Sequence, residues 1–558
     1  MLCNPAKPST GANVTRLFIT VISVILLTAC GSGETNVDRG NRAGILYWGN
    51  GEEPQDLDPH ITTGVSESYI QESLFEPLVN SHPETLEPEP GVAQRWDIND
   101  DKTTYTFHLN PNARWSNGEP VTAEDFRWTF WRAMHPKLGN QYNYMYYPIK
   151  NAGPYLRGDI NDFDKVGIKV IDKQTLQIQL ENPTPYFLGL LSHHSYYPVP
   201  RSAIEAHGNA WTRGSHWTRP GNMVSNGAFR LTQWKLFNYI EVEKNPYYHK
   251  ADQVALNGIR FLPTENITTE ERMFRANQLH HTYELPADKT SYYRENAPEQ
   301  LLNQPYLGTY YYRLNTRIKP LDNPKVRRAL ALAINRQQIV ERITKQGQLP
   351  AFTITPPNTA GYTAESSLRY DPEEARRLLA EAGYPSGEGI DTLEVLYNTK
   401  ESHRKIAVAI QQMWKQELNI NITLRNEDWK VYLDSEKRGE YQVSRASWIG
   451  DYLDPNTFLD LWIKDGGNNR TGWHNPEYDR LVLEQAPRAS SREQRYALLM
   501  QAEKILLDEV PVIPIYTYAT RHLVHPSLKG VTPNLLDRPF FSHFSLEDTQ
   551  TQRPNESN

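Results

Sequence analysis

Two pairs of adjacent histidines are candidate metal ligands. The pairs are His193-His194 and His280-His281. Neighbouring side chains on a strand point to opposite faces, so adjacent histidines rarely reach one ion. The acidic pair Glu52-Glu53 is typical of a solvated surface, and nothing in the sequence pairs it as glycosidases require. We therefore expect no metal site and no cofactor.

The motifs that mark common enzyme classes are missing from the sequence. It has no P-loop, no Gly-x-Gly-x-x-Gly after a strand, no His-Glu-x-x-His and no Gly-x-Ser-x-Gly. Aromatic residues make up 11% of the chain, with 32 tyrosines, which leaves sugar binding open as an alternative. The sequence favours a binding protein over an enzyme, and we assign no catalytic residue.

Cysteine use and the first 30 residues indicate export. The only cysteines are Cys3 and Cys30, so the body of the chain has no pair for a disulfide. Lys7 and Arg16 precede an apolar run at 17–27, which is too short to span a bilayer and suits a signal peptide. The run ends in Leu27-Thr28-Ala29-Cys30, which resembles the bacterial lipobox. We expect a lipoprotein signal peptide at 1–29, with a lipidated Cys30 and flexible tether at 30–43. A plain secretory signal or a short buried helix is the alternative.

Length and charge narrow the class further. A chain of 558 residues is too long for one hydrophobic core, so two or three domains are expected. The formal net charge is -7, which disfavours nucleic acid as a partner.

The predicted secondary structure that must position any site differs between the two halves of the chain. The first half predicts mainly strands, one helix at 122–134 with a capping box, and a hairpin formed by 166–171 and 175–180. The second half alternates helices and strands. Helices are predicted at 323–345, 371–383, 402–418, 429–438 and 491–509, and strands at 392–397, 420–425, 441–448 and 512–518. This alternation predicts an α/β domain over 308–519.

Several ordered segments resemble family 5 of the extracellular solute-binding proteins of ABC importers, in its oligopeptide-binding branch. They include Pro90-Gly91-Val92-Ala93 with Trp96, the runs at 105–109, 113–118 and 121–126, Asn226-Gly227-Ala228-Phe229, Val326-Arg327-Arg328-Ala329-Leu330 and Glu381-Ala382-Gly383-Tyr384. The resemblance runs from about Leu46 to Phe544.

The resemblance implies an α/β fold of the periplasmic binding protein type II-like class, with two large hinged lobes and a small inserted domain. The implied discontinuous domain I comprises 44–65, 201–307 and 520–547. Domain II is the insertion at 66–200, and domain III is 308–519. The implied function is that of an importer's substrate-binding lipoprotein: a monomer that captures short peptides and delivers them to permease subunits. It would sit in the periplasm or at the cell surface, anchored to a bacterial membrane.

The resemblance also implies which residues hold the peptide termini. Asp451 matches the acid that pairs with the N-terminal ammonium, and a buried ammonium needs such a partner. Arg445 matches a residue that meets the carboxylate of longer peptides, which suits a planar guanidinium. His403 matches a histidine that meets the carboxylate at another ligand length, and His193 matches a pocket histidine. Their alternatives are a helix-capping acid, a structural ion pair and ordinary core or surface histidines.

Further matches concern the pocket walls. Glu53 matches a pocket acid that favours basic side chains, and the aromatic residues Tyr142, Trp429 and Trp448 match pocket walls. Such walls tolerate many side chains, although ordinary core packing is the alternative.

The chain departs from the family's pattern at two places. Thr344 replaces a lysine that reads very short peptides, so Lys345 is the candidate substitute. Gly308 and Ile449 replace a disulfide. Peptide length and sequence preference therefore stay open. So do a ligand such as a cell-wall peptide or an oligosaccharide, and a sensor or chaperone-like role without a transporter.

Overall fold

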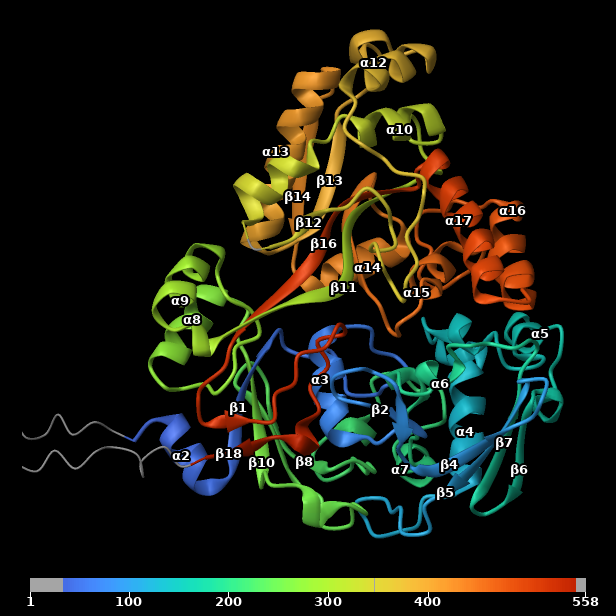
Figure 1. The fold of residues 1–558 in the computed structure, drawn as a ribbon, viewed down its shortest axis with the longest axis vertical. Coiled ribbons are helices and arrows are strands. Elements are labelled where there is room, and N and C mark those ends of the chain that lie inside the picture. The colour runs from blue at the N-terminus through green and yellow to red at the C-terminus, as the bar shows by residue number, and fades with distance from the viewer. Residues whose placement is uncertain (1–33, 346, 548–558) are drawn as a thin grey trace, which may run out of the picture.

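The computed structural model describes residues 34–345 and 347–547, so the predicted signal peptide and Cys30 lie outside the described residues. The chain forms an upper body and a lower body (Figure 1). The upper body holds the elements from α10 to α17, and the lower body holds β1 to β10 together with the C-terminal segment.

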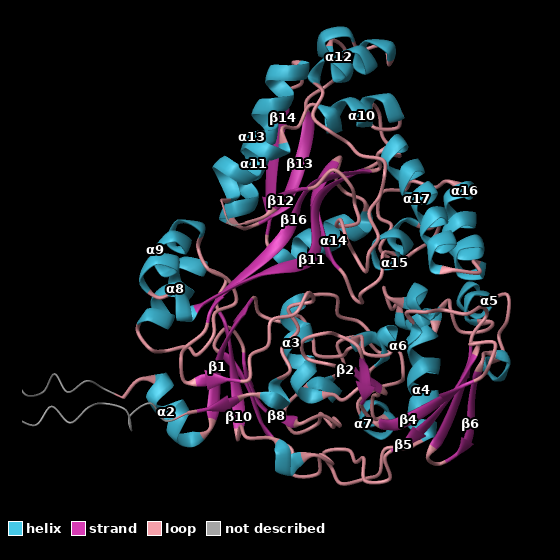
Figure 2. Ribbon diagram, in the orientation of Figure 1, coloured by secondary structure: helices cyan, strands magenta, loops and turns pink. Residues whose placement is uncertain are grey.

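A six-stranded mixed sheet forms the centre of the upper body, with the strand order β12-β16-β11-β15-β13-β14. Its helices lie around the sheet (Figure 2), and α13 and α14 both contact β13 and β14. The strands are β11 (Leu301–Leu314), β12 (Leu349–Pro350), β13 (Leu393–Asn398), β14 (Ile422–Glu427), β15 (Val443–Ile449) and β16 (Val512–Leu523).

Two four-stranded sheets build the lower body, with the orders β1-β10-β9-β8 and β4-β5-β7-β6. The strands of the first are β1 (Ile45–Gly51), β8 (Phe229–Lys235), β9 (Tyr239–Lys244) and β10 (Gly258–Pro263). Those of the second are β4 (Ala93–Ile98), β5 (Thr104–Leu109), β6 (Ile168–Asp172) and β7 (Thr175–Gln179). Two short pairs complete the strands, β2 (Val79–Ser81) with β3 (Pro88–Pro90) and β17 (Leu528–Lys529) with β18 (Ser545–Leu546).

The α-helices of the lower body are α2 (Asn36–Ala43), α3 (Val65–Leu74), α4 (Ala123–Met134), α5 (Ala152–Arg157), α6 (Phe187–Leu190), α7 (Arg201–Ala206), α8 (Ile267–Arg275) and α9 (Thr290–Asn296). Those of the upper body are α10 (Pro324–Leu332), α11 (Arg336–Ile339), α12 (Pro372–Glu381), α13 (Glu401–Leu418), α14 (Trp429–Arg438), α15 (Asn456–Leu459), α16 (Pro476–Asp479) and α17 (Arg492–Glu509). Short 3-10 and π turns connect them.

The structure confirms most of the predicted elements and corrects two. The flexible tether predicted over 30–43 is wrong for 36–43, which form helix α2 with Val37 and Gly40 buried, because α2 packs against β1. Thr122 and Asp125 form the predicted capping box at the start of α4. The helix predicted over 323–345 is interrupted: α10 ends at Leu332, and Asn335 then caps the new helix α11. A cap residue takes a non-helical backbone conformation, so the asparagine breaks a run that its apolar spacing alone would continue.

Two long strands pass between the bodies (Figure 1). β11 and β16 pair in antiparallel fashion along most of their length, and the register shifts between Pro305 and Thr309. This irregularity falls at the predicted boundary between 307 and 308. The domain limits themselves remain a prediction, but the strands provide a connection about which two lobes could turn.

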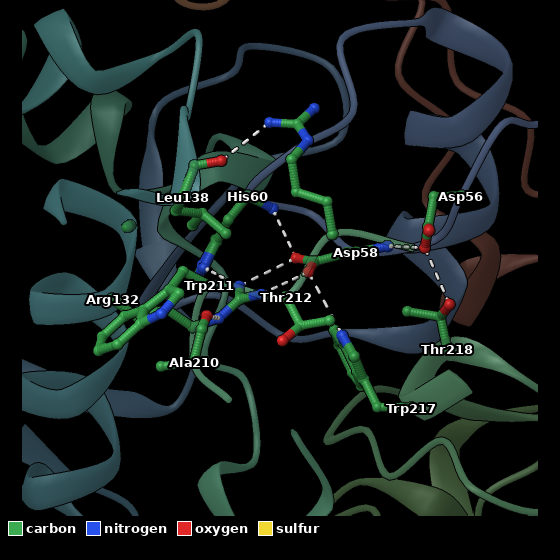
Figure 3. Close-up of polar contacts among 12 residues, drawn as sticks. Asp56, Asp58, His60, Arg132, Leu138, Ala210, Trp211, Thr212, Trp217 and Thr218 are labelled. Carbon is green, nitrogen blue, oxygen red and sulfur yellow. Dashed lines mark hydrogen bonds and ion pairs between the residues drawn. The ribbon is translucent and has the colours of Figure 1, made fainter. Parts of the chain in front are cut away.

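A buried ion pair holds the lower body together (Figure 3). Arg132 of α4 meets Asp58 at 2.5 Å, with side chains only 1% and 2% exposed. Arg132 Nε donates to the carbonyl of Ala210, and Trp217 Nε1 donates to Asp58 Oδ2 at 3.3 Å. The backbone N–H of His60 donates to Asp58 Oδ1. The network therefore joins three segments that are far apart in the sequence.

Within 34–345 and 347–547, no helix has the length and apolarity needed to cross a bilayer. The same residues contain no group of three or more histidine, cysteine or acidic side chains that could hold a metal ion.

Candidate ligand-binding cavity

A cavity of about 1310 Å³ lies between the two bodies. Its lining includes 63–66, 68–69 and 192–194 from the lower body, and 400–405 and 445–451 from the upper body. Pockets for small molecules are commonly about 300–1,000 Å³, so this one has room for a larger ligand.

Asp451 follows β15 and points a half-satisfied carboxylate into the cavity. Its side chain is 10% exposed, and its Oδ1 lies 3.1 Å from Nε2 of His193. Its Oδ2 is buried and has no hydrogen-bond partner within the described residues. Burial raises the pKa of this carboxyl well above its usual value. The site thus holds an acid whose ionised form lacks a positive partner.

His193 cannot supply that positive charge. Its Nδ1 accepts from the backbone N–H of Ser195, so the proton of the neutral ring lies on Nε2, facing Asp451. Burial, together with the cationic Arg538, lowers the pKa of His193 to about 3. The histidine is therefore neutral at physiological pH and brings no charge to the acid.

Arg445 lies on β15 with no acidic partner. Its guanidinium donates to Asn398 Oδ1 at 3.2 Å and to the hydroxyl of Tyr518 at 3.1 Å, and it lies over the ring of Tyr310. The residue is 7% exposed, and Nε has no hydrogen-bond partner among the described residues. Among those residues, no carboxylate lies within ion-pair distance of Arg445, so its charge is open to a ligand carboxylate.

His403 of α13 lies near Arg445 through a shared neighbour. Its Nδ1 is 3.5 Å from the hydroxyl of Tyr310, the ring that also lies under the guanidinium. Burial, with Arg445 and Lys400 adding to it, lowers the pKa of His403 well below its usual value. A neutral imidazole can donate one hydrogen bond to a carboxylate but offers no charge.

Tyr142, Trp448, Trp429 and Lys345 also line the cavity. The ring of Tyr142 lies 4.6 Å from that of His193 and 6.1 Å from that of Trp448, so one aromatic wall surrounds Asp451. Trp429 begins α14 and stacks on Tyr432 with the ring centroids 5.7 Å apart. Lys345 is exposed and adopts a left-handed conformation after the helical turn that ends at Thr344.

Glu53 is the one predicted site residue that lies outside the cavity lining. Its carboxylate accepts hydrogen bonds from Trp234 Nε1 at 2.7 Å and from the backbone of Phe237 at 3.1 Å. The adjacent Glu52 lines the cavity instead. β1 ends at Gly51 and the chain bends at Glu52, so the two consecutive glutamates have different surroundings. Burial raises the pKa of Glu52 to about 7.

The strand that carries these groups has an unpaired edge. β15 pairs with β11 from Val443 to Ile449 but with β13 only at Val443 and Ser444. From Arg445 to Ile449 its other edge has no strand partner among the described residues, and these residues line the cavity. An exposed strand edge is a template for an extended peptide backbone.

The two positions at which the sequence resemblance predicts the loss of a disulfide are cross-strand partners. Gly308 of β11 lies opposite Ile449 of β15. A Cβ at Gly308 would approach Ile449 Cδ1 to 2.4 Å, so the isoleucine occupies the space above the glycine. A single apolar side chain therefore fills the space between these two positions.

Sequence reasoning missed several charged residues of the cavity wall. Glu284 and Lys400 form an ion pair of 2.5 Å between the two bodies. Arg313 and Arg470 both contact the carboxylate of Glu436. Arg313 follows three tyrosines in β11, and a charged residue in such a buried strand is a signal that sequence reasoning could have used.

Comparison with known proteins gives a consistent family. Residues 87–470 match the model of the bacterial extracellular solute-binding proteins, family 5 Middle. The periplasmic oligopeptide-binding protein OppA of Salmonella typhimurium is 35% identical over 537 residues, which cover 93% of this chain and 96% of that protein.

Solved structures agree with this assignment. The Escherichia coli murein tripeptide binding protein MppA superposes with a TM-score of 0.84 at 34% identity, covering 90% of this chain and 98% of the other. The Haemophilus influenzae OppA in complex with RPPGFSPFR gives 0.83 at 33% identity, covering 90% and 99%. These matches confirm the predicted two-lobed, type II-like α/β fold.

A second MppA structure shows which arrangement of the lobes is present. The unliganded open form of that protein covers 97% of its length at the same identity, but its TM-score is only 0.63. The relatives are substrate-binding proteins rather than enzymes, as the sequence predicted for this chain. The chain belongs to family 5 of the bacterial extracellular solute-binding proteins, and its lobes are arranged unlike the open form of its relative.

Proposed function

We propose that this protein captures short peptides between its two lobes and delivers them to an ABC importer. The ligand ammonium pairs with Asp451, and the ligand carboxylate meets Arg445, His403 or Lys345 according to peptide length. The proposal rests on family membership and on the chemistry of the cavity.

The observation that carries the proposal is the unpartnered oxygen of Asp451. A buried carboxylate without a cation is costly, and the raised pKa expresses that cost. An ammonium at Oδ2 would offset it and leave Oδ1 beside His193. A neutral ligand group could form only a hydrogen bond there, so the site selects a positive charge.

The spacing of the two charged groups suits a short extended chain. Asp451 lies six residues after Arg445, so at about 3.3 Å per residue their Cα atoms are at most about 20 Å apart. An extended peptide spans about the same length in roughly six residues. The unpaired edge of β15 between them offers hydrogen bonds that do not depend on the ligand's sequence. Side chains of different types can then lie against Tyr142, Trp448 and Trp429.

Ligand binding would stabilise the closed arrangement, because only then do both lobes contribute contacts. Asp451 belongs to the upper body and His193 to the lower one. A ligand that touches both favours closure by its differential affinity. The closed form would present a surface to the permease subunits. We further propose a lipid anchor on Cys30, which would hold the protein at a bacterial membrane in the periplasm or at the cell surface, as a monomer.

Three other roles are compatible with the same fold. One is a tethered sensor or chaperone-like lipoprotein without a transporter. The others are a specialised receptor for cell-wall peptides, favoured by the likeness to the murein tripeptide binding protein, or for oligosaccharides. Peptide-dependent growth that is lost on deletion of this gene supports the importer role over the sensor role.

Calorimetric titration tests the binding proposal. Tri- to pentapeptides with free termini are compared with N-acetylated and C-amidated forms of the same sequences. We expect acetylation to weaken binding at least 100-fold, because it removes the charge that Asp451 needs, and amidation to weaken it less. Equal binding of free and acetylated peptides rules out Asp451 as the ammonium anchor.

A further inference from the structure

Arg313, Arg470 and Glu436, here called the guanidinium cluster, lie in the cavity wall with one more positive than negative charge. Glu436 Oε2 is 2.7 Å from Nη1 of Arg313 and 2.9 Å from Nη1 of Arg470. Within the described residues Glu436 is the only carboxylate within ion-pair distance of either guanidinium. The three side chains are 5%, 10% and 3% exposed for Arg313, Arg470 and Glu436.

The neighbours of the cluster do not balance this charge. Glu436 also accepts from Ser444 Oγ, and Arg313 donates to the hydroxyl of Tyr311. Burial opposes ionisation of Glu436, but Arg313 and Arg470 outweigh it and hold the pKa of the carboxyl below its usual value. The acid is therefore ionised, and one of the two arginines has no counter-charge.

The unbalanced charge comes with free donors. Nε of Arg313 and Nε of Arg470 are both buried, and neither has a hydrogen-bond partner among the described residues. Both arginines line the ligand cavity. Buried guanidinium donors without acceptors are costly, and a carboxylate is the group whose geometry suits them.

The cluster lies on the opposite face of β15 from Arg445. Arg313 of β11 pairs in register with Ser444, whereas Tyr312 pairs with Arg445. Side chains alternate between the faces of a sheet, so Arg313 and Ser444 project to one side and Arg445 to the other. A peptide extended along the free edge of β15 also alternates its side chains, so every second one faces the guanidinium cluster.

Closure brings the lower body to the same place. Arg470 donates through Nη2 to Gln141 Oε1 at 2.6 Å. Gln141 directly precedes the cavity residue Tyr142 in the lower body. A ligand group bound at Arg470 would therefore lie at the junction of the two lobes.

We propose that the guanidinium cluster binds a second ligand carboxylate, carried by an acidic side chain of the peptide. Neighbouring side chains of an extended peptide face opposite sides, so the protein should prefer Asp or Glu at one of two adjacent peptide positions and not at the other. This inference rests on the proposed peptide-binding function. It names a ligand class, acidic peptides, which the anchors for the two termini do not define.

Titration of the full chain with matched tetrapeptides tests the proposal. Glu and Gln are compared in Ala-Glu-Ala-Ala and Ala-Ala-Glu-Ala and their glutamine forms, with tetra-alanine as the reference. We expect Glu to bind at least 10-fold tighter than Gln at one position and within about 2-fold at the other. The C-amidated peptides separate the two sources of carboxylate, since the Glu preference should persist when the terminal carboxylate is removed.

Variants locate the preference. Arg470→Gln leaves a neutral pair of Arg313 and Glu436, so the Glu preference should fall to about 2-fold or less while tetra-alanine still binds. Arg404→Gln is the matched control, because it removes the same charge from an exposed position of the same cavity and should keep the preference. Glu436→Gln should enlarge the preference, and thermal unfolding checks that each variant is folded.

The outcomes separate this inference from the broader function. Tetra-alanine that binds, with Glu and Gln equal at both positions, overturns the acidic subsite and leaves peptide capture standing. An equal preference for Glu at both positions also overturns the acidic subsite, and so does a preference that survives in Arg470→Gln. Either result would show that the overall positive potential of the cavity, and not the guanidinium cluster, causes the preference. Failure of every peptide to bind contradicts the proposed function itself.

Discussion

Two buried regions of this protein each contain an aspartate and an arginine. The charges are paired in one region and have no opposite charge beside them in the other. In the lower body, Asp58 meets a guanidinium, an indole N–H and a backbone N–H, and Arg132 is shared with a backbone carbonyl (Figure 3). In the cavity, the Asp451 carboxylate lies beside the neutral ring of His193, and the hydrogen-bond partners of the Arg445 guanidinium are neutral. A satisfied network fixes segments to one another. An unsatisfied one retains the capacity to bind a charged ligand.

The difference between the two regions is tested most clearly by replacing one arginine in each, Arg132 in the lower body and Arg445 in the cavity. Arg132→Met strands Asp58 as an uncompensated buried charge, so the free energy of unfolding should fall by about 3–5 kcal/mol. Arg445→Met removes an equally buried arginine but strands no acid. Its stability loss should be smaller by at least about 2 kcal/mol, as measured by denaturant unfolding. Equal losses would contradict the distinction.

The arginine that matters less for stability should matter more for binding. Arg445→Met should weaken binding of free tetra- or pentapeptides by about 1.5–3 kcal/mol, the usual worth of a hydrogen bond to a charged group. Titration with the C-amidated peptide should show little further loss in this variant. An unchanged affinity for the free peptide would remove Arg445 from the proposed site.

The pH dependence of stability should have opposite signs for the two aspartates. Burial opposes ionisation of Asp58, but Arg132 outweighs it and lowers the pKa, so Asp58 stabilises the fold above the ordinary carboxylate range and loses this contribution on acidification. Burial raises the pKa of Asp451, so its contribution is most favourable at low pH and is lost as the pH rises through the raised value.

Denaturant unfolding of the ligand-free chain between about pH 2.5 and pH 7 checks these signs. The stability of the wild type relative to Asp58→Asn should fall as the pH decreases below the ordinary carboxylate value of about 4, and it should change little between about pH 5 and pH 7. Relative to Asp451→Asn, the stability of the wild type should decrease as the pH rises from about 4 toward the raised pKa. The same slope for both variants would show that the two acids experience similar environments.

The smallest expected effect concerns the two adjacent glutamates. Glu52→Gln should lower the affinity for lysine-containing peptides by about 1 kcal/mol, and the effect should grow as the pH rises through about 7, where the acid ionises. Glu53→Gln should leave this affinity unchanged within about 0.3 kcal/mol, since Glu53 binds Trp234 outside the cavity. Calorimetric titration at pH 6 and pH 8 measures both; a loss confined to Glu53→Gln would reverse the assignment.

The sequence predicted much of this architecture because its signals are local. The capping box at Thr122 and the alternation of helices and strands after residue 308 follow from periodicity and turn chemistry. The break at Asn335 was missed because the apolar spacing continues across it. The different surroundings of Glu52 and Glu53 could not be predicted, because the local sequence does not distinguish two consecutive glutamates.

The charged residues of the cavity wall could be grouped only from the three-dimensional structure. Arg313, Glu436 and Arg470 are separated by more than 30 residues from one another. Arg313 lies in β11, Glu436 in α14 and Arg470 in the segment between α15 and α16, so they meet only in the folded upper body. The excess of positive charge is a property of the assembled wall and of no single segment. Similarly, the missing partner of Asp451 is visible only when every neighbouring group has been placed.

A double-mutant cycle tests most directly whether Asp451 pairs with the ammonium of the ligand. One peptide, with a free and an acetylated N-terminus, is titrated against the wild type and Asp451→Asn. The account predicts a coupling energy of about 2–4 kcal/mol, because acetylation should cost the wild type far more than the variant. A coupling energy near zero, with acetylation equally harmful to both proteins, would contradict it.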